Sequence, residues 1–162
     1  MLLFEFLQQN HWAFLLSVIL IGLVAGSFLN VVILRLPKMM EQQWRRDCQE
    51  LEGNVCNQAP ETYTLSRPAS HCPECGHKIR PWENIPILSW LFLKGRCSRC
   101  NTSISPRYPI IEAVTAILSL IVALHFGFSW ATLAALFLTW ALIALSVIDF
   151  DVQLLPDNIT LP

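Results

Sequence analysis

The sequence predicts an all-α polytopic membrane protein with a small cytoplasmic zinc-ribbon-like domain. Of its 162 residues, 54% are hydrophobic and only 14% are charged, whereas about a quarter of the residues of an ordinary soluble domain are charged. All 11 Lys and Arg residues lie between Arg35 and Arg107, so uncharged segments flank a polar middle. The net charge of −1 and the absence of a glycine-rich phosphate loop argue against nucleic-acid binding and nucleotide chemistry.

The first membrane span is predicted within residues 1–34, with a periplasmic N-terminus. Residues 13–34 are 22 residues without an ionisable group, and at 1.5 Å per residue they cover roughly 33 Å, the thickness of the hydrocarbon core. A cleavable signal peptide is disfavoured because no basic segment precedes them. Gly22, Gly26 and Asn30 recur every four residues, which favours close helix packing over the alternative, a direct catalytic role.

Two further apolar segments predict a transmembrane hairpin over residues 108–148 that turns near Gly127. Residues 128–148 carry no charge. Residues 110–126 are apolar except for Glu112 near the start and His125 near the end. Glu112 is either a boundary carboxylate stabilised by the helix dipole or a functional intramembrane acid, and the sequence leaves both open.

The distribution of basic residues predicts the orientation in the membrane. Lys and Arg favour the cytoplasmic side of short loops, which makes residues 35–107 a cytoplasmic domain. The third span then ends in the cytoplasm at Asp149, followed by an acidic segment and the start of a further helix over residues 149–162.

The cytoplasmic domain contains two C-x-x-C knuckles separated by 21 residues. This pattern predicts a structural zinc ion with four thiolate ligands and no open coordination position. Two disulfides or a redox dithiol are weaker alternatives, because the cytoplasm is reducing. The predicted ligands are Cys72, Cys75, Cys97 and Cys100.

Other residues near the knuckles have ordinary explanations. His71 and His77 are expected to be solvated or to lie behind the ligands, and Cys48 and Cys56 to be reduced thiols. Gly95 is expected to permit a tight turn, with a cofactor contact as the alternative. The aromatic, proline-containing linker over residues 80–90 either covers the ribbon or rests at the membrane interface, where Trp is common.

Asp149 lies where a helix C-terminus and a poorly hydrated boundary both disfavour negative charge. In aspartic proteases two carboxylates share one proton, and one activates water while the other protonates the scissile carbonyl. The residues alone leave a catalytic Asp149 and a solvated juxtamembrane loop equally open. Asp157, which follows Pro156, resembles a helix N-cap.

Taken together and in order, these motifs resemble the type IV prepilin peptidases, which are bacterial inner-membrane aspartic proteases of the GxGD class. The resemblance covers nearly the whole chain. It is carried by residues 26–31 (GSFLNV), 35–37 (RLP), both knuckles, 80–86 (RPWENIP), 107–112 (RYPIIE), 148–149 (ID) and 155–157 (LPD).

The resemblance implies a multi-pass inner-membrane enzyme with Asp149 as its first catalytic aspartate. Such enzymes cleave the leader of type IV prepilins and type II secretion pseudopilins, then methylate the new N-terminal residue with S-adenosylmethionine. The family associates methyl transfer with the region matching residues 35–107. It assigns no methyl-donor ligand here, and Glu112 and Gly95 are only guesses.

One departure from the family concerns the second catalytic aspartate, which belongs to a Gly-x-Gly-Asp motif. The six glycines of this sequence never occur two positions apart, and Asp151 is a poor substitute because it lies on the same segment as Asp149. We therefore expect an N-terminal portion of a longer enzyme. The alternatives are a membrane-anchored zinc ribbon that recruits a partner without catalysis, and an inactive fragment.

Overall fold

The computed structural model describes residues 2–51, 64–65 and 70–153. Its element order is α1 (Leu2–Gln9), α2 (His11–Leu51), η1 (Pro81–Asn84), α3 (Leu88–Phe92), α4 (Arg107–Phe126) and α5 (Trp130–Val152). Within the described residues there is no β-strand, only isolated bridges between His71 and Lys78 and between Arg96 and Ser103. Helices α2, α4 and α5 are each long and apolar enough to cross a membrane. The predicted all-α membrane fold is confirmed.

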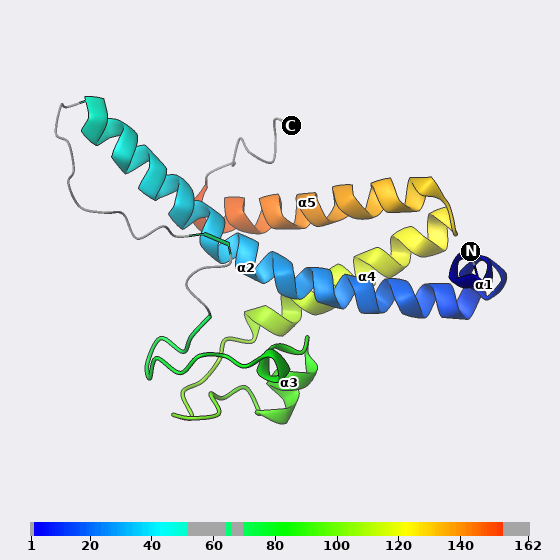
Figure 1. Ribbon diagram of the computed structural model, residues 1–162, viewed down its shortest axis with the longest axis horizontal. Coiled ribbons are helices and arrows are strands. Elements are labelled where there is room, and N and C mark those ends of the chain that lie inside the picture. The colour runs from blue at the N-terminus through cyan, green and yellow to red at the C-terminus, as the bar shows by residue number, and fades with distance from the viewer. Residues whose placement is uncertain (1, 52–63, 66–69, 154–162) are drawn as a thin grey trace.

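Figure 1 shows α2, α4 and α5 side by side as a bundle, with α3 and its neighbouring loops beside the start of α4. Helix α2 does not end near residue 34, where the uncharged segment ends, but continues through Pro37 to Leu51. Its second half is rich in Met, Gln, Glu and Arg, which favour helix, and Arg45 pairs with Glu41 at 2.6 Å one turn earlier. The end of hydrophobicity therefore did not mark the end of the helix.

Helices α2 and α4 are in close contact at the predicted stripe of small residues. A Cβ atom on Gly26 would lie 2.7 Å from the Glu112 Cα atom, and one on Gly22 would lie 3.0 Å from the Ala116 Cα atom. One turn further, the Asn30 Nδ2 atom donates to the Tyr108 carbonyl oxygen at 3.1 Å. The stripe is a helix-packing surface, as predicted, and Asn30 has its polar partner there.

Two apolar clusters fill the bundle, and a polar layer lies on the α4 side between them. Thr115 and Ser119 are fully buried, and their hydroxyls donate to main-chain oxygens one turn back at 2.7 Å. The Trp140 indole N–H of α5 donates to the Ser119 hydroxyl at 3.0 Å, which ties the third helix to α4. The clusters consist of Phe14, Leu15, Val18, Ala123 and Leu136, and of Leu29, Ile33, Ile111, Ala144 and Ile148.

The hairpin between α4 and α5 turns at Gly127, whose φ of 61° is a conformation that glycine adopts readily. The Gly127 N–H closes α4 on the Ala123 carbonyl, and the Ser129 hydroxyl caps α5 by accepting from the Thr132 N–H at 3.3 Å. This turn places the start of α4 and the end of α5 at the same end of the bundle (Figure 1).

We expect Gly26→Ala to destabilise the folded bundle by about 1–3 kcal/mol, because the added methyl group collides with the α4 backbone. Reversible unfolding of the purified protein in mixed micelles measures this loss. Val24→Ala is the control, since Val24 lies on the same helix and is 64% exposed. Equal stability of Gly26→Ala and the wild type would contradict the close contact between the two helices.

Candidate functional site

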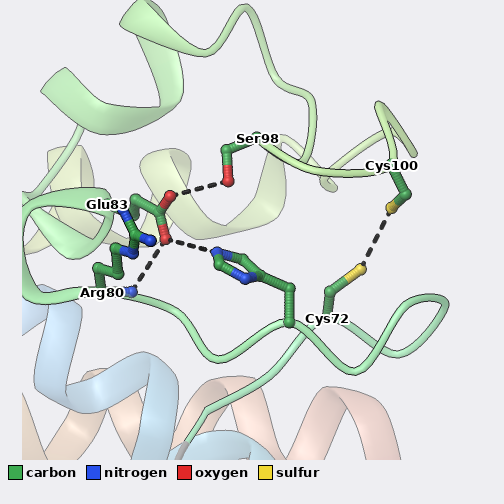
Figure 2. A network of polar contacts seen from close by, with 6 residues as sticks. Cys72, Arg80, Glu83, Ser98 and Cys100 are labelled. Atoms are coloured by element: carbon green, nitrogen blue, oxygen red, sulfur yellow. Dashed lines mark hydrogen bonds and ion pairs between the residues drawn. The ribbon is translucent and has the colours of Figure 1, made fainter.

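The four predicted ligand cysteines come together in the structure. The Sγ atoms of Cys72, Cys75, Cys97 and Cys100 all lie within 4.8 Å of one another, and those of Cys72 and Cys100 are 3.7 Å apart (Figure 2). In a tetrahedral thiolate site with Zn–S bonds near 2.3 Å, two sulfurs are roughly 3.8 Å apart. The donor set and its spacing fit a zinc ion, so these cysteines could hold one.

The two knuckles use the same backbone arrangement. In each, the residue after the second cysteine has a positive φ, 66° at Gly76 and 58° at Asn101, and its N–H donates to the carbonyl of the first cysteine at 3.0 Å. The first cysteine in turn donates its N–H at 2.9 Å to the carbonyl of His77 or Thr102. Asn tolerates this left-handed conformation better than most residues, so Asn101 takes the place of the glycine in the second knuckle.

The surroundings of Cys100 favour its thiolate form. Hydrogen bonding with the Thr102 hydroxyl, and next with the Thr102 backbone, lowers the pKa of Cys100 to about 6, because it favours the thiolate. The Cys100 sulfur lies 3.2 Å from the Thr102 hydroxyl oxygen. Since metal binding requires thiolates, Thr102 supports the predicted ligand set.

The Glu83 carboxylate links the two knuckles through the segment between them (Figure 2). One oxygen accepts from the Arg80 N–H at 2.9 Å and lies 3.4 Å from His77 Nε2, and the other accepts from the Ser98 hydroxyl at 2.8 Å. The Arg80 N–H contributes most, and the Ser98 hydroxyl next, to lowering the pKa of Glu83. Glu83 therefore holds the knuckles together from behind the sulfur cluster.

Sequence reasoning missed Glu83, although a local signal was present. Pro81 begins η1 and Glu83 occupies its third position, a combination typical of a helix start whose acid bonds back to the capping backbone. His77, expected to be solvated or behind the ligands, has a side chain that is only 18% exposed and faces Glu83.

Gly95 lies against an aromatic ring. Its φ is 67°, and a Cβ atom there would lie 2.9 Å from the Cζ2 atom of Trp90. The Trp90 indole N–H donates to the Ile104 carbonyl at 3.2 Å. The tight turn and the packed indole account for glycine at this position, while a cofactor contact stays an untested prediction.

We call residues 70–106, which contain both knuckles, the knuckle segment. Glu112 joins this segment to the helical bundle. It is 7% exposed, and its carboxylate accepts the Ile87 N–H at 2.7 Å. Ile87 has a φ of 58°, which is strained for a β-branched residue, so the bond fixes an otherwise unfavourable backbone. Arg35 of α2 makes a second connection, because its guanidinium donates to the Ser70 hydroxyl at 3.4 Å. It also donates to the Thr64 and Leu65 carbonyl oxygens at 3.0 and 3.2 Å.

Asp149 is exposed in the last turn of α5. Within the described residues, no side chain or main-chain N–H donates to its carboxylate. Asp151, considered above as a substitute for the second catalytic aspartate, instead forms an ion pair with Arg107 at the start of α4. The two acids therefore have different surroundings although they are two positions apart.

Several sequence-based predictions lie outside the described residues. Residues 155–157, with Pro156 and Asp157, are among them, and so is Cys56. The described parts of the site share one end of the bundle, where α5 ends and the knuckles lie beside the start of α4 (Figure 1).

Comparisons with known proteins agree with the predicted resemblance. The chain is 53% identical over 160 residues to the prepilin leader peptidase/N-methyltransferase of Pseudomonas aeruginosa, and these residues are 99% of this chain and 55% of that protein. It is 50% identical over 143 residues to the protein of the same name from Neisseria gonorrhoeae, which covers 88% of this chain and 50% of that protein.

The chain thus spans about half the length of these curated relatives. No solved structure gives a significant match. Residues 20–126, from within α2 to the end of α4, match the family described as the bacterial peptidase A24 N-terminal domain. The tetracysteine cluster and the α2–α4 contact both lie inside this matched region, and the chain belongs to the bacterial peptidase A24 N-terminal domain family.

Proposed function

We propose that this chain is the N-terminal part of a bacterial inner-membrane prepilin peptidase and N-methyltransferase. The enzyme would cleave the leader of type IV prepilins and type II secretion pseudopilins and then methylate the new N-terminal residue. The observation that carries this proposal is the family match together with the names of relatives that align over 88% or more of the chain.

In this proposal Asp149 is one of two catalytic aspartates, and the second comes from outside these 162 residues. Support comes from the position of Asp149, exposed at the end of α5, while Asp151 is occupied by Arg107. An exposed carboxylate can approach a second carboxylate, share its proton and activate water on a peptide carbonyl. The basic character of residues 35–107 supports a cytoplasmic position for this end of the bundle.

We propose S-adenosylmethionine as the methyl donor, on the basis of the relatives' names. When bound, it would supply the methyl group for the new N-terminal amine. Neither residue suggested by the sequence suits the donor. Gly95 has no side chain and its Cα lies against the Trp90 ring. The Glu112 carboxylate is buried and already accepts the Ile87 N–H. We therefore assign no methyl-donor ligand in this chain.

We propose that the four clustered cysteines bind a structural zinc ion. Four thiolates fill a tetrahedral shell and leave no position for water or substrate. The metal would act by fixing the knuckle segment, and Glu83 would hold the two halves of that segment together from the other side.

Asp149→Asn in the full-length enzyme is expected to reduce prepilin cleavage by at least about a hundredfold, since Asn cannot exchange a proton with water or substrate. Cleavage is measured on a purified prepilin in detergent. Asp47→Asn, the same chemical change at an exposed position of α2, is the control and should cleave normally. Normal cleavage by Asp149→Asn would contradict the peptidase role and favour a zinc ribbon that recruits a partner.

The purified full-length enzyme is expected to contain about one zinc ion per chain, as a four-thiolate structural site requires. Cys72→Ser and Cys97→Ser should lose the metal and make the knuckle segment sensitive to proteolysis, because metal binding is coupled to folding. Zinc content by atomic emission and limited proteolysis provide the measurements. Cys48→Ser, which changes an exposed cysteine outside the cluster, should keep its zinc. Full zinc content in Cys72→Ser would exclude the proposed site.

A further inference from the structure

Helix α3 presents one face that is entirely apolar and exposed. Leu88, Leu91 and Phe92 are 52%, 57% and 84% exposed, and their spacing of three and four residues puts them on the same side of the helix. Trp90, in contrast, is half-buried and bonded to the Ile104 carbonyl. Just before α3, Trp82 and Ile85 are also exposed, at 61% and 45%. We call Leu88, Leu91 and Phe92 the α3 face, and Trp82 and Ile85 are exposed apolar residues that precede it.

The hydrogen bond between Ile87 and Glu112 fixes how far α3 lies along the bundle. Ile87 directly precedes α3, and Glu112 is in the second turn of α4, about 7 Å along the axis from Arg107. Helix α3 therefore begins beside the first turns of α4 and does not lie beyond the start of that helix, as Figure 1 also shows. Helix α4 is one of the three helices apolar enough to cross a membrane.

The exposed apolar surface of α4 starts at this same level. Its outward side chains follow helical spacing from Ile110 to Leu124, and Ile110 and Val114, on either side of Glu112, are 56% and 41% exposed. Lipid is what covers such a stripe on a membrane-spanning helix. Because the α3 face begins beside the same turn, it lies at the depth where the lipid-facing surface begins.

The charge around the α3 face favours a lipid surface as its partner. Residues 70–106 contain five basic and two acidic side chains, and such an excess attracts anionic headgroups. The Arg80 guanidinium lies over the Trp82 ring, 5.5 Å from its centroid, and Trp is enriched at membrane interfaces. The basic residues are Lys78, Arg80, Lys94, Arg96 and Arg99, and the acidic ones are Glu74 and Glu83.

We propose that the α3 face inserts into the boundary between headgroups and acyl chains, so that α3 acts as an interfacial anchor for the metal-binding segment. Short amphipathic helices lie in this boundary with their apolar side a few ångströms below the headgroups. The anchor would hold the knuckles against the membrane at the end of the bundle that carries Asp149. The inference depends on α4 crossing the membrane and not on peptidase activity.

The test places a small environment-sensitive fluorescent amino acid at position 92, and separately at position 74, in the full-length protein. Glu74 is an exposed acidic residue of the first knuckle and serves as the matched control. The protein is reconstituted in nanodiscs of phosphatidylethanolamine and phosphatidylglycerol that contain lipids with a nitroxide on the acyl chain near the headgroup. Emission from position 92 should shift to the blue and lose most of its intensity, whereas position 74 should keep the emission of a water-exposed probe.

Equal, weak quenching at positions 92 and 74 would overturn the proposal. So would a blue shift at position 92 that appears only after a prepilin is added, because the face would then bind a protein substrate. Position 91 is a second probe site on the same side of α3, and resistance to limited proteolysis equal to that of the unlabelled protein shows that each labelled protein is folded. If the unlabelled full-length protein does not cleave a prepilin while quenching at position 92 persists, the proposed function fails and the anchor stands.

Discussion

The backbone contact between α2 and α4 determines where the other parts of this protein lie. Gly22 and Gly26 let the two helices approach so closely that a single methyl group at Gly26 would lie 2.7 Å from the Glu112 Cα atom. Glu112 is buried beside this contact, and its carboxylate accepts the N–H of Ile87, the residue before α3. This bond fixes the position of α3 along α4. Helix α5 then packs on both partners through Ala144 and Ile148, which brings the last turn of α5 to the same end.

The knuckle segment has little apolar core with which to hold itself together. Among its described residues, Cys72 and Cys97 are the only hydrophobic side chains that are buried. Its order instead comes from polar sources, namely the repeated knuckle hydrogen bonds, the Glu83 carboxylate and the proposed metal. Small segments of this kind depend on metal binding for folding free energy. Glu83 reduces that dependence by joining Ser98 of one knuckle to Arg80 after the other.

The sequence was sufficient for features that depend on local spacing, and insufficient for those that depend on distant contacts. The uncharged segments predicted three spans, and the C-x-x-C pairs predicted the sulfur cluster. The helical course of α2 beyond residue 34 was missed because hydropathy reports burial in lipid and not helix length. The partner of Glu112 is 25 positions away and that of Arg107 is 44 positions away, so no local pattern contains them. These contacts arise only in the folded protein, one where α4 packs beside α5 and the other where the residue before α3 meets α4.

The geometry of α5 separates the roles of its two terminal acids. Residues two positions apart on an α-helix point about 160° away from each other. Since Asp151 reaches across to Arg107 at the start of α4, Asp149 must project from the side of α5 turned away from that contact. The ion pair compensates the charge of Asp151, and two uncompensated carboxylates close together would oppose each other's ionisation. In the proposed enzyme, Asp149 is therefore the acid left open for a second carboxylate, which would approach α5 from the side that α4 does not cover.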